Sequence, residues 1–293
     1  MRTTSMAMIA CAGMAAAALG VGPAAAAPAF GNYVALGDSW AADATLTQVD
    51  SDFVPVGCVQ SRGDYAKQVA AALRVPDFRD ATCGGAETGD MTGPQDSPLG
   101  GTNPPQFERL TPTTDLVTLE IGGNDAGLAA AVQDCLTLNP AVSPCQATWV
   151  PGGVDRMSAR IAASAPKVRA TIAGIRARAP HARILLLDYL QGVGTTGGCF
   201  PLIPISDTDA MWVGRKLVEL DGMLAGVAAE TGVQFVNTYR GSIGHDACQP
   251  PGTRWVEGLI PFSSNPPGPA VPFHPNQLGA DYQARSVLAA LGR

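Results

Sequence analysis

Four short apolar runs, separated by helical patterns, constrain the fold of this chain most strongly. The runs suit strands buried on both faces and cover residues 33–36, 116–121, 184–187 and 234–236. The helical patterns cover 65–73, 155–179, 207–231 and 275–291. We expect Pro166 to interrupt the second pattern and Pro275 to occupy the first turn of the last. Such alternation predicts an α/β fold, in which helices cover both faces of a parallel sheet.

The first 26 residues have the pattern of a secretory signal peptide. Arg2 precedes an alanine-rich apolar stretch, and small residues at Ala24 and Ala26 suit cleavage behind Ala26. Cys11 lies inside the apolar stretch, so attachment of a lipid there is the less favoured alternative. We therefore expect an exported protein with one domain at residues 27–293 and no membrane span after removal of the signal. Whether it stays free in the medium or on the cell envelope is left open.

The cysteines agree with export. Apart from Cys11 there are six, an even number that predicts a disulfide framework in an exported protein. They are Cys58, Cys83, Cys135, Cys145, Cys199 and Cys248. Six cysteines allow 15 connectivities. We favour sequential pairing, because each bridge would then brace a separate loop-rich segment.

Composition limits the partners. The mature length and a hydrophobic content of 46% suit one domain with a large core. The net charge of −6 argues against nucleic acid and anionic membrane surfaces as partners. With no Cys-x-x-Cys and only three histidines, we expect no zinc site. The sequence implies no cofactor or catalytic metal, and a structural ion is left open. A monomer is the default expectation.

Four short blocks carry the candidate chemistry. They are Gly37–Trp40 behind the first apolar run, Cys83–Ala86, Ile121–Asp125 behind the second run, and Phe273–Asn276 before the last helix. Ligand sites in parallel sheets lie at the carboxyl ends of the strands, where Ser39 and Asn124 are expected. Each block is weak evidence alone, but the four in this order indicate a serine hydrolase.

The blocks divide into a nucleophile, a base and donors for an oxyanion. A serine hydroxyl needs a base to take its proton, and His274 fits that role for Ser39. Attack on a carbonyl produces an oxyanion, which needs donors aimed at it in advance. The backbone N–H groups of Ser39 and Gly85 and the side-chain amide of Asn124 can supply three.

These blocks resemble the SGNH hydrolases of the GDSL esterase/lipase superfamily, and within it the secreted actinobacterial esterases and lipases. The resemblance continues through Ala179–Arg183, Gly244–Cys248 and Trp255–Leu259 and so covers essentially the whole mature chain. It implies a three-layer α/β/α, flavodoxin-like fold, Ser39 as nucleophile and the three oxyanion donors named above. It also implies sequential disulfides.

Three positions depart from the family pattern. Trp40 replaces the leucine of GDSL, and Gly84 stands where relatives often carry serine. More important, Val271 occupies the position of the usual aspartate, three residues before the histidine. That aspartate normally orients the imidazole. We expect a main-chain carbonyl of the 265–271 loop to take its place, which would make a Ser–His dyad; a nearby acid such as Asp246 would instead restore a triad.

The leading function is a secreted esterase or lipase that acts on small-molecule or lipid esters through an acyl-enzyme. A phospholipase A or an acyltransferase could use the same residues, and a non-catalytic exported binding protein is the third alternative. An α/β-hydrolase is disfavoured because Ala41 breaks Gly-x-Ser-x-Gly. Several apolar residues could line an acyl pocket: Trp40, Trp149, Phe200, Leu202, Ile203 and Trp255.

Overall fold

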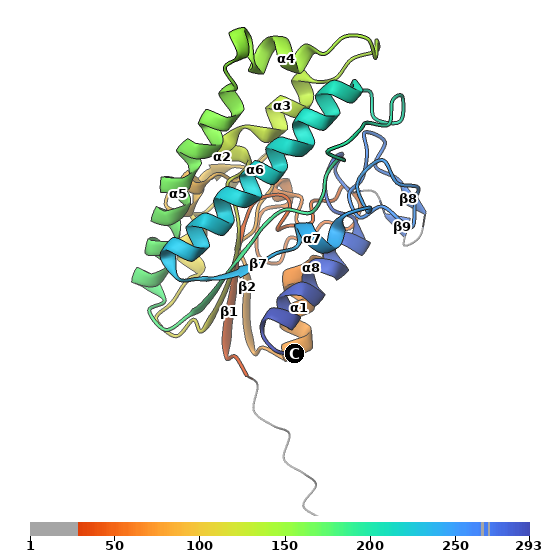
Figure 1. The fold of residues 1–293 in the computed structure, drawn as a ribbon. Helices are drawn as coiled ribbons and strands as arrows, with labels where there is room; N and C mark the ends of the chain where they lie inside the picture. The colour runs from red at the N-terminus through yellow and green to blue at the C-terminus, as the bar shows by residue number, and fades with distance from the viewer. Residues whose placement is uncertain (1–28, 265–266, 269) are drawn as a thin grey trace, which may run out of the picture.

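A central sheet of five parallel strands organises the protein (Figure 1). The computed structural model describes residues 29–264, 267–268 and 270–293, so the predicted signal segment lies outside the described residues. The strands lie in the order β2-β1-β5-β6-β7. Their bounds are β1 (Asn32–Gly37), β2 (Asp77–Asp80), β5 (Leu116–Glu120), β6 (Arg183–Leu187) and β7 (Gln234–Val236). The parallel pairing along the whole sheet confirms the predicted α/β fold.

The predicted strands match four of the five, and β2 was missed. β2 reads Asp-Phe-Arg-Asp and pairs only with β1, at the edge of the sheet. An edge strand is not buried on both sides, so it needs no apolar run. Two further pairs of very short strands lie in loops, β3 (Gln95–Asp96) with β4 (Thr102–Asn103) and β8 (Ser263–Ser264) with β9 (Pro267–Gly268).

Long helices cover the two faces of the sheet. On one face lie α1 (Tyr65–Leu73) and α8 (Gln277–Ala290), and on the other α5 (Arg156–Arg178) and α6 (Asp207–Thr231), as Figure 1 shows. Shorter α-helices are α2 (Gly123–Ala126), α3 (Leu128–Asp134), α4 (Pro144–Trp149) and α7 (Tyr239–Ser242). Short 3₁₀ turns cover Val56–Cys58, Thr88–Met91, Gln106–Arg109 and Pro151–Gly153.

Alternation along β1 divides the core in two. Tyr33 and Ala35 pack with α1 and α8, whereas Val34 and Leu36 pack with α5 and α6. All four side chains are fully buried. Burial on both faces is the reason that this strand reads as an unbroken apolar run rather than as an alternating one.

Two expectations about prolines were wrong. Pro166 does not interrupt α5, which runs unbroken from Arg156 to Arg178. Because Pro166 lies on the exposed face of α5, the carbonyl that it leaves unbonded can meet water. Pro275 precedes α8 and is not in its first turn; the helix is capped by Asn276, whose side chain accepts hydrogen bonds from Leu278 N (3.0 Å) and Gly279 N (3.3 Å).

Three disulfides brace the loops outside the sheet. The pairs are Cys58–Cys83, Cys135–Cys145 and Cys199–Cys248, the sequential pattern that the resemblance implies. Among the described helices, none combines the length and apolar character that crossing a bilayer requires.

Candidate active site

Ser39 lies directly behind β1, at the carboxyl end of the sheet. The chain turns sharply at Gly37, whose φ is 151°; a Cβ atom there would lie 2.4 Å from the carbonyl oxygen of Glu120 and 2.6 Å from the Cβ atom of Ala41. No side chain fits in that space, so glycine is required. The turn leaves Ser39 partly exposed while its neighbour Asp38 is buried.

A buried glutamine holds the turn in place. Gln106 accepts a hydrogen bond from Gly37 N and donates one to Gly37 O, each at 2.8 Å. The side-chain amide thus pairs with the strand end as another strand would. This pair fixes the backbone two residues before Ser39.

Asp38 fixes the other side of the same turn. Its carboxylate accepts hydrogen bonds from Trp40 N (2.9 Å) and from the hydroxyl of Tyr189 (2.6 Å), and that hydroxyl accepts one from Gly123 N (2.9 Å). The chain of bonds joins the first block to the third. Desolvation by burial raises the pKa of Asp38 to about 6, and the bonds from Tyr189 and Trp40 limit the rise. Its contacts with backbone and tyrosine indicate a structural role.

His274 meets Ser39 across the cleft. Its Nε2 lies 2.7 Å from Ser39 Oγ, and its Nδ1 lies 2.8 Å from the carbonyl oxygen of Pro272. A carbonyl can only accept, so Nδ1 carries the proton and Nε2 is free to accept the serine proton. This is the tautomer that a general base needs.

The environment of His274 keeps the ring neutral. Each ring nitrogen has a partner within the protein, although the residue as a whole is partly exposed, and the Trp40 ring centroid lies 6.2 Å from that of the imidazole. Desolvation by burial lowers the pKa of His274 to about 4, while the hydrogen bond to Pro272 opposes the shift. At neutral pH the ring is therefore uncharged and ready to accept a proton.

The group that orients His274 is a main-chain carbonyl, but it belongs to Pro272, one residue beyond the loop expected to supply it. Asp246, the acid considered as an alternative, is engaged elsewhere, because its carboxylate accepts a hydrogen bond from Cys248 N at 2.9 Å. Phe273 has a left-handed backbone with φ of 60°, and this turn connects Pro272 to His274.

Residues 254–257 lie antiparallel to the segment that carries His274. Glu257 N donates to His274 O (2.9 Å), and Phe273 N donates to Glu257 O (3.2 Å). Behind this pairing, Arg254 and Glu257 form a buried ion pair at 2.6 Å, and Asn276 donates to the Glu257 carboxylate at 2.7 Å. His274 is therefore supported by a second strand-like segment and a buried charge pair.

The two remaining blocks meet beside Ser39. The Asn124 side-chain amide donates to Ala86 O at 2.9 Å, which places it against the loop that contains Gly85. Gly85 is exposed and has φ of 75°, a backbone conformation that favours glycine. Within the described residues, no acceptor bonds the N–H of Ser39 or of Gly85.

Asp125 ties the same two blocks together. Its carboxylate accepts hydrogen bonds from Thr88 N (2.9 Å) and Thr88 Oγ1 (2.6 Å) and pairs with Lys167 at 3.1 Å. Asp125, like Asp38, thus organises the local backbone.

An apolar cavity of about 450 Å³ opens beside Ser39 and His274. It runs between α3 and α6, and its walls include Leu128, Val132, Leu136, Ile205, Val213, Leu217 and Leu259. Of the six apolar residues considered for an acyl pocket, only Trp40 lines it. Trp149 packs against Trp212 instead, with the ring centroids 6.5 Å apart. The cavity-lining leucines and valines of α3 and α6 were not singled out in the sequence because they resemble ordinary core residues of a helix.

Among the described residues, one cluster has the spacing of a metal site. It consists of Cys135, Cys145 and Asp209. Both sulfur atoms are joined in a disulfide, and Asp209 accepts a hydrogen bond from Cys145 N at 3.0 Å. A disulfide sulfur is not a thiolate ligand, so the cluster does not suit a metal ion.

Comparison with known proteins identifies the family. A model described as the GDSL-like Lipase/Acylhydrolase family matches residues 35–282. Lipase 2 of Streptomyces coelicolor is 35% identical over 277 residues, which cover 92% of this chain and 88% of that protein. A lipase of Streptomyces rimosus is 28% identical over 269 residues, covering 89% of this chain and 85% of that one.

A solved structure agrees. The crystal structure of an extracellular lipase from Streptomyces rimosus matches with a TM-score of 0.71 and 25% identity, over 88% of this chain and 99% of that one. The chain belongs to the GDSL-like lipase/acylhydrolase family of the SGNH superfamily and is a carboxylic ester hydrolase.

Proposed function

We propose that the protein is a secreted serine esterase or lipase in which Ser39 and His274 act as a catalytic dyad. The observation that carries the proposal is the 2.7 Å contact between His274 Nε2 and Ser39 Oγ, with Nδ1 held by a carbonyl that fixes the tautomer. A hydroxyl paired in this way with a neutral imidazole is an activated nucleophile.

In the first half of the reaction, Ser39 Oγ attacks the ester carbonyl while its proton passes to His274 Nε2. The tetrahedral intermediate places a negative charge on the former carbonyl oxygen. The N–H groups of Ser39 and Gly85 and the amide of Asn124 donate to that oxygen. When the intermediate collapses, the carbon–oxygen bond to the alcohol breaks and His274 returns its proton to the leaving alcohol.

In the second half, water attacks the acyl-enzyme and gives up its proton to His274. Collapse of the second tetrahedral intermediate releases the acid and returns the proton to Ser39 Oγ. No carboxylate pairs with His274 in the part of the chain that the structure describes, so the carbonyl of Pro272 is the group that stabilises the imidazolium formed in each half. The cycle is closed and requires no cofactor.

The apolar cavity supports an aliphatic acyl group as the part of the substrate that this enzyme selects. Its volume of about 450 Å³ lies in the range of ordinary small-molecule sites, and its walls along α3 and α6 are mainly leucine and valine. Disulfides and the predicted signal segment support action outside the cell.

The test is hydrolysis of p-nitrophenyl esters from acetate to palmitate by the mature protein and by Ser39→Ala. We expect activity in the wild type, with a preference for chains longer than acetate, and loss of at least about 10⁴-fold in the variant. Equal circular dichroism and denaturant midpoints would show that the variant is folded. A folded Ser39→Ala protein that retained its activity would overturn the proposal.

A further inference from the structure

Three segments of the chain contain no charged residue and no histidine. They are residues 135–154, 189–206 and 258–273. Charged residues make up 15% of the whole chain, but none lies in these three segments. Surface loops are normally polar and charged, because they face water.

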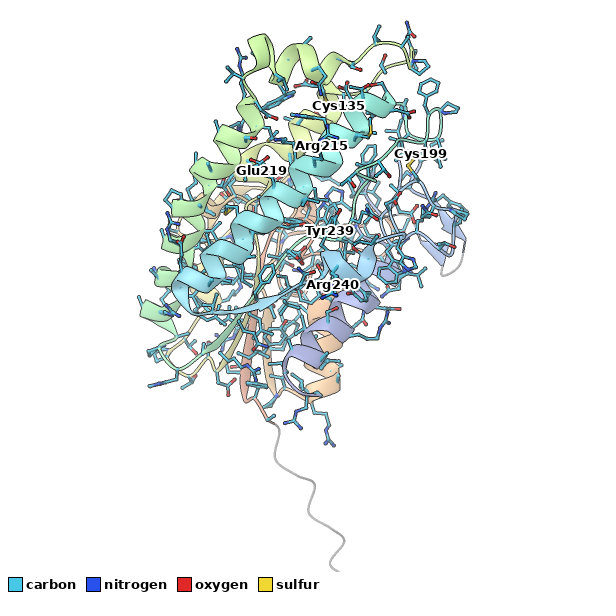
Figure 2. The ribbon with its side chains drawn as sticks, viewed as in Figure 1. Cys135, Cys199, Arg215, Glu219, Tyr239 and Arg240 are labelled. Carbon is cyan, nitrogen blue, oxygen red and sulfur yellow. A yellow bond between two sulfur atoms is a disulfide. The ribbon has the colours of Figure 1, made fainter. Side chains whose placement is uncertain are left out.

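The described parts of the three segments meet in space although they are far apart in sequence. Thr137 N donates to Pro204 O at 2.7 Å, and Leu136 forms a β-bridge with Ile205. At Gly258, an added Cβ atom would lie 3.7 Å from the side chain of Ile203, so the third segment lies beside the second. Cys135 and Cys199 accordingly both lie in the upper part of Figure 2.

Together the segments expose large apolar side chains, and we call this surface the mouth face. Leu138 is 93% exposed, Ile260 77% and Phe262 60%. The full set is Leu136, Leu138, Val142, Leu202, Leu259, Ile260 and Phe262. An exposed apolar surface of this kind indicates an interaction site.

The charged residues next to the segments bring no free cation to the mouth face. Arg254 and Glu257 are buried against each other. Asp134 and Asp207 are exposed at the ends of segments, but the first accepts a hydrogen bond from the Trp149 indole (3.0 Å) and the second from Gly198 N (3.2 Å).

The acyl cavity opens in the mouth face. Leu136 and Leu259 line the cavity and are also 38% and 37% exposed, so each belongs to both surfaces. The apolar surface is therefore continuous from the outside of the molecule to the neighbourhood of Ser39.

We infer that the mouth face docks on the surface of aggregated lipid whose headgroups are neutral or zwitterionic. Apolar side chains at the tips of the loops enter the lipid layer, and an acyl chain passes from the layer into the cavity without crossing water. The net charge of −6 and the lack of a free cation next to the three segments give an anionic surface nothing to bind. The transfer of the acyl chain rests on the proposed function, whereas docking does not.

The test uses Ser39→Ala protein, so that bound lipid is not consumed, and vesicles of phosphatidylcholine in a co-sedimentation assay. The face variant carries Leu138→Ser and Ile260→Ser in addition. The matched control carries Val218→Ser and Ile243→Ser, which are exposed aliphatic residues outside the mouth face. Val218 lies on α6 between Arg215 and Glu219, which are labelled in Figure 2.

We expect the parent and the control to bind and the face variant to bind at least about tenfold more weakly, because each lost aliphatic group removes transfer free energy. Binding should persist in 0.5 M salt, and anionic phosphatidylglycerol in the vesicles should weaken it at low salt. Absence of binding by the parent, equal binding by the face variant, or binding lost in salt would overturn the inference. So would a stable dimer of the parent that the face variant cannot form, because a second copy would then cover the face.

A second measurement separates this inference from the proposed function. With Ser39 restored, the face variant should hydrolyse dissolved p-nitrophenyl butyrate as fast as wild type, because neither Leu138 nor Ile260 lines the cavity. If wild type itself does not hydrolyse the ester, the proposed function is refuted. The vesicle-binding measurement would still test the docking inference.

Discussion

The two sides of the catalytic cleft are held by different means. On the nucleophile side, buried polar side chains fix the backbone around Ser39: Gln106 pairs with Gly37, and Tyr189 links Asp38 to Gly123. On the base side, His274 is held by main-chain hydrogen bonds to Pro272 and Glu257. The nucleophile side directly follows strand β1 of the sheet, whereas the base side consists of loops.

The difference shows where each side can fail. A strand end is already placed by the sheet, so a few side chains suffice to fix its final turn. A loop has no such frame, and it needs a buried ion pair and a disulfide behind it, here Arg254–Glu257 and Cys199–Cys248. Damage to the base side should therefore appear first in stability, and damage to the nucleophile side first in catalysis.

Glu257→Gln should give the largest effect on the base side. The substitution leaves the Arg254 charge buried without its counter-ion, which typically costs about 3–5 kcal/mol of unfolding free energy. Urea unfolding measures this cost as a lower midpoint. Glu230→Gln, in the exposed pair with Arg169, is the matched control and should change stability by less than about 1 kcal/mol. Equal midpoints for the two variants would contradict the comparison.

Asn124→Ala should act on the nucleophile side through catalysis. Removing one oxyanion donor lowers kcat by about 10²–10³-fold, or about 2.7–4 kcal/mol of transition-state stabilisation. Steady-state kinetics on a p-nitrophenyl ester measures the loss, with KM expected to change little. Asn139→Ala, in an exposed loop, is the control. A loss smaller than about tenfold would remove Asn124 from the oxyanion hole.

The pH dependence of kcat/KM tests the base side of the cleft, because it depends on the protonation of His274. Only the neutral ring can accept the serine proton, and burial lowers the pKa of His274 to about 4. The profile of kcat/KM should therefore stay flat as pH falls below the ordinary histidine value of about 6.5 and should drop only near pH 4. A discontinuous assay of released acid between pH 3.5 and 8 measures it. An acidic limb at about 6.5 would contradict a desolvated His274.

Asp246→Asn should give the smallest effect. If the Pro272 carbonyl alone orients His274, kcat should remain within about twofold of wild type, whereas loss of a triad carboxylate costs about 10⁴-fold. Asp134→Asn on the exposed end of α3 is the control for a change of charge. A large loss at Asp246 alone would replace the dyad by a triad.

Most of the fold could be predicted from the sequence because four strands are buried on both faces and the long helices have clear ends. Gly232, for example, ends α6 in a left-handed conformation, as its position after the helical pattern predicts. β2 escaped because an edge strand with Asp77 and Arg79 carries no apolar run. The interruption expected at Pro166 was wrong because the destabilisation of a helix by proline depends on whether the proline lies on its buried or its exposed face.

The candidate site was predictable where side chains carry it and not where the backbone does. Ser39, Asn124 and His274 stand in short blocks whose order indicates the chemistry, and the fold brings them together. The sequence could not show that Pro272 supplies the acceptor for His274, since every residue has a main-chain carbonyl. Tyr189 and Gln106 also escaped, because only the tertiary structure shows which buried polar groups face each other.

The carbonyl of Pro272 has an evolutionary consequence. A carboxylate that orients a histidine can be deleted by one codon change, but a main-chain oxygen survives every substitution at its position. The contact between this oxygen and His274 can therefore be altered only through the path of the loop, by changes in residues that never touch His274. Substitutions in the loop that carries Pro272 should therefore change activity gradually, whereas loss of an orienting aspartate would abolish most of it in a single step.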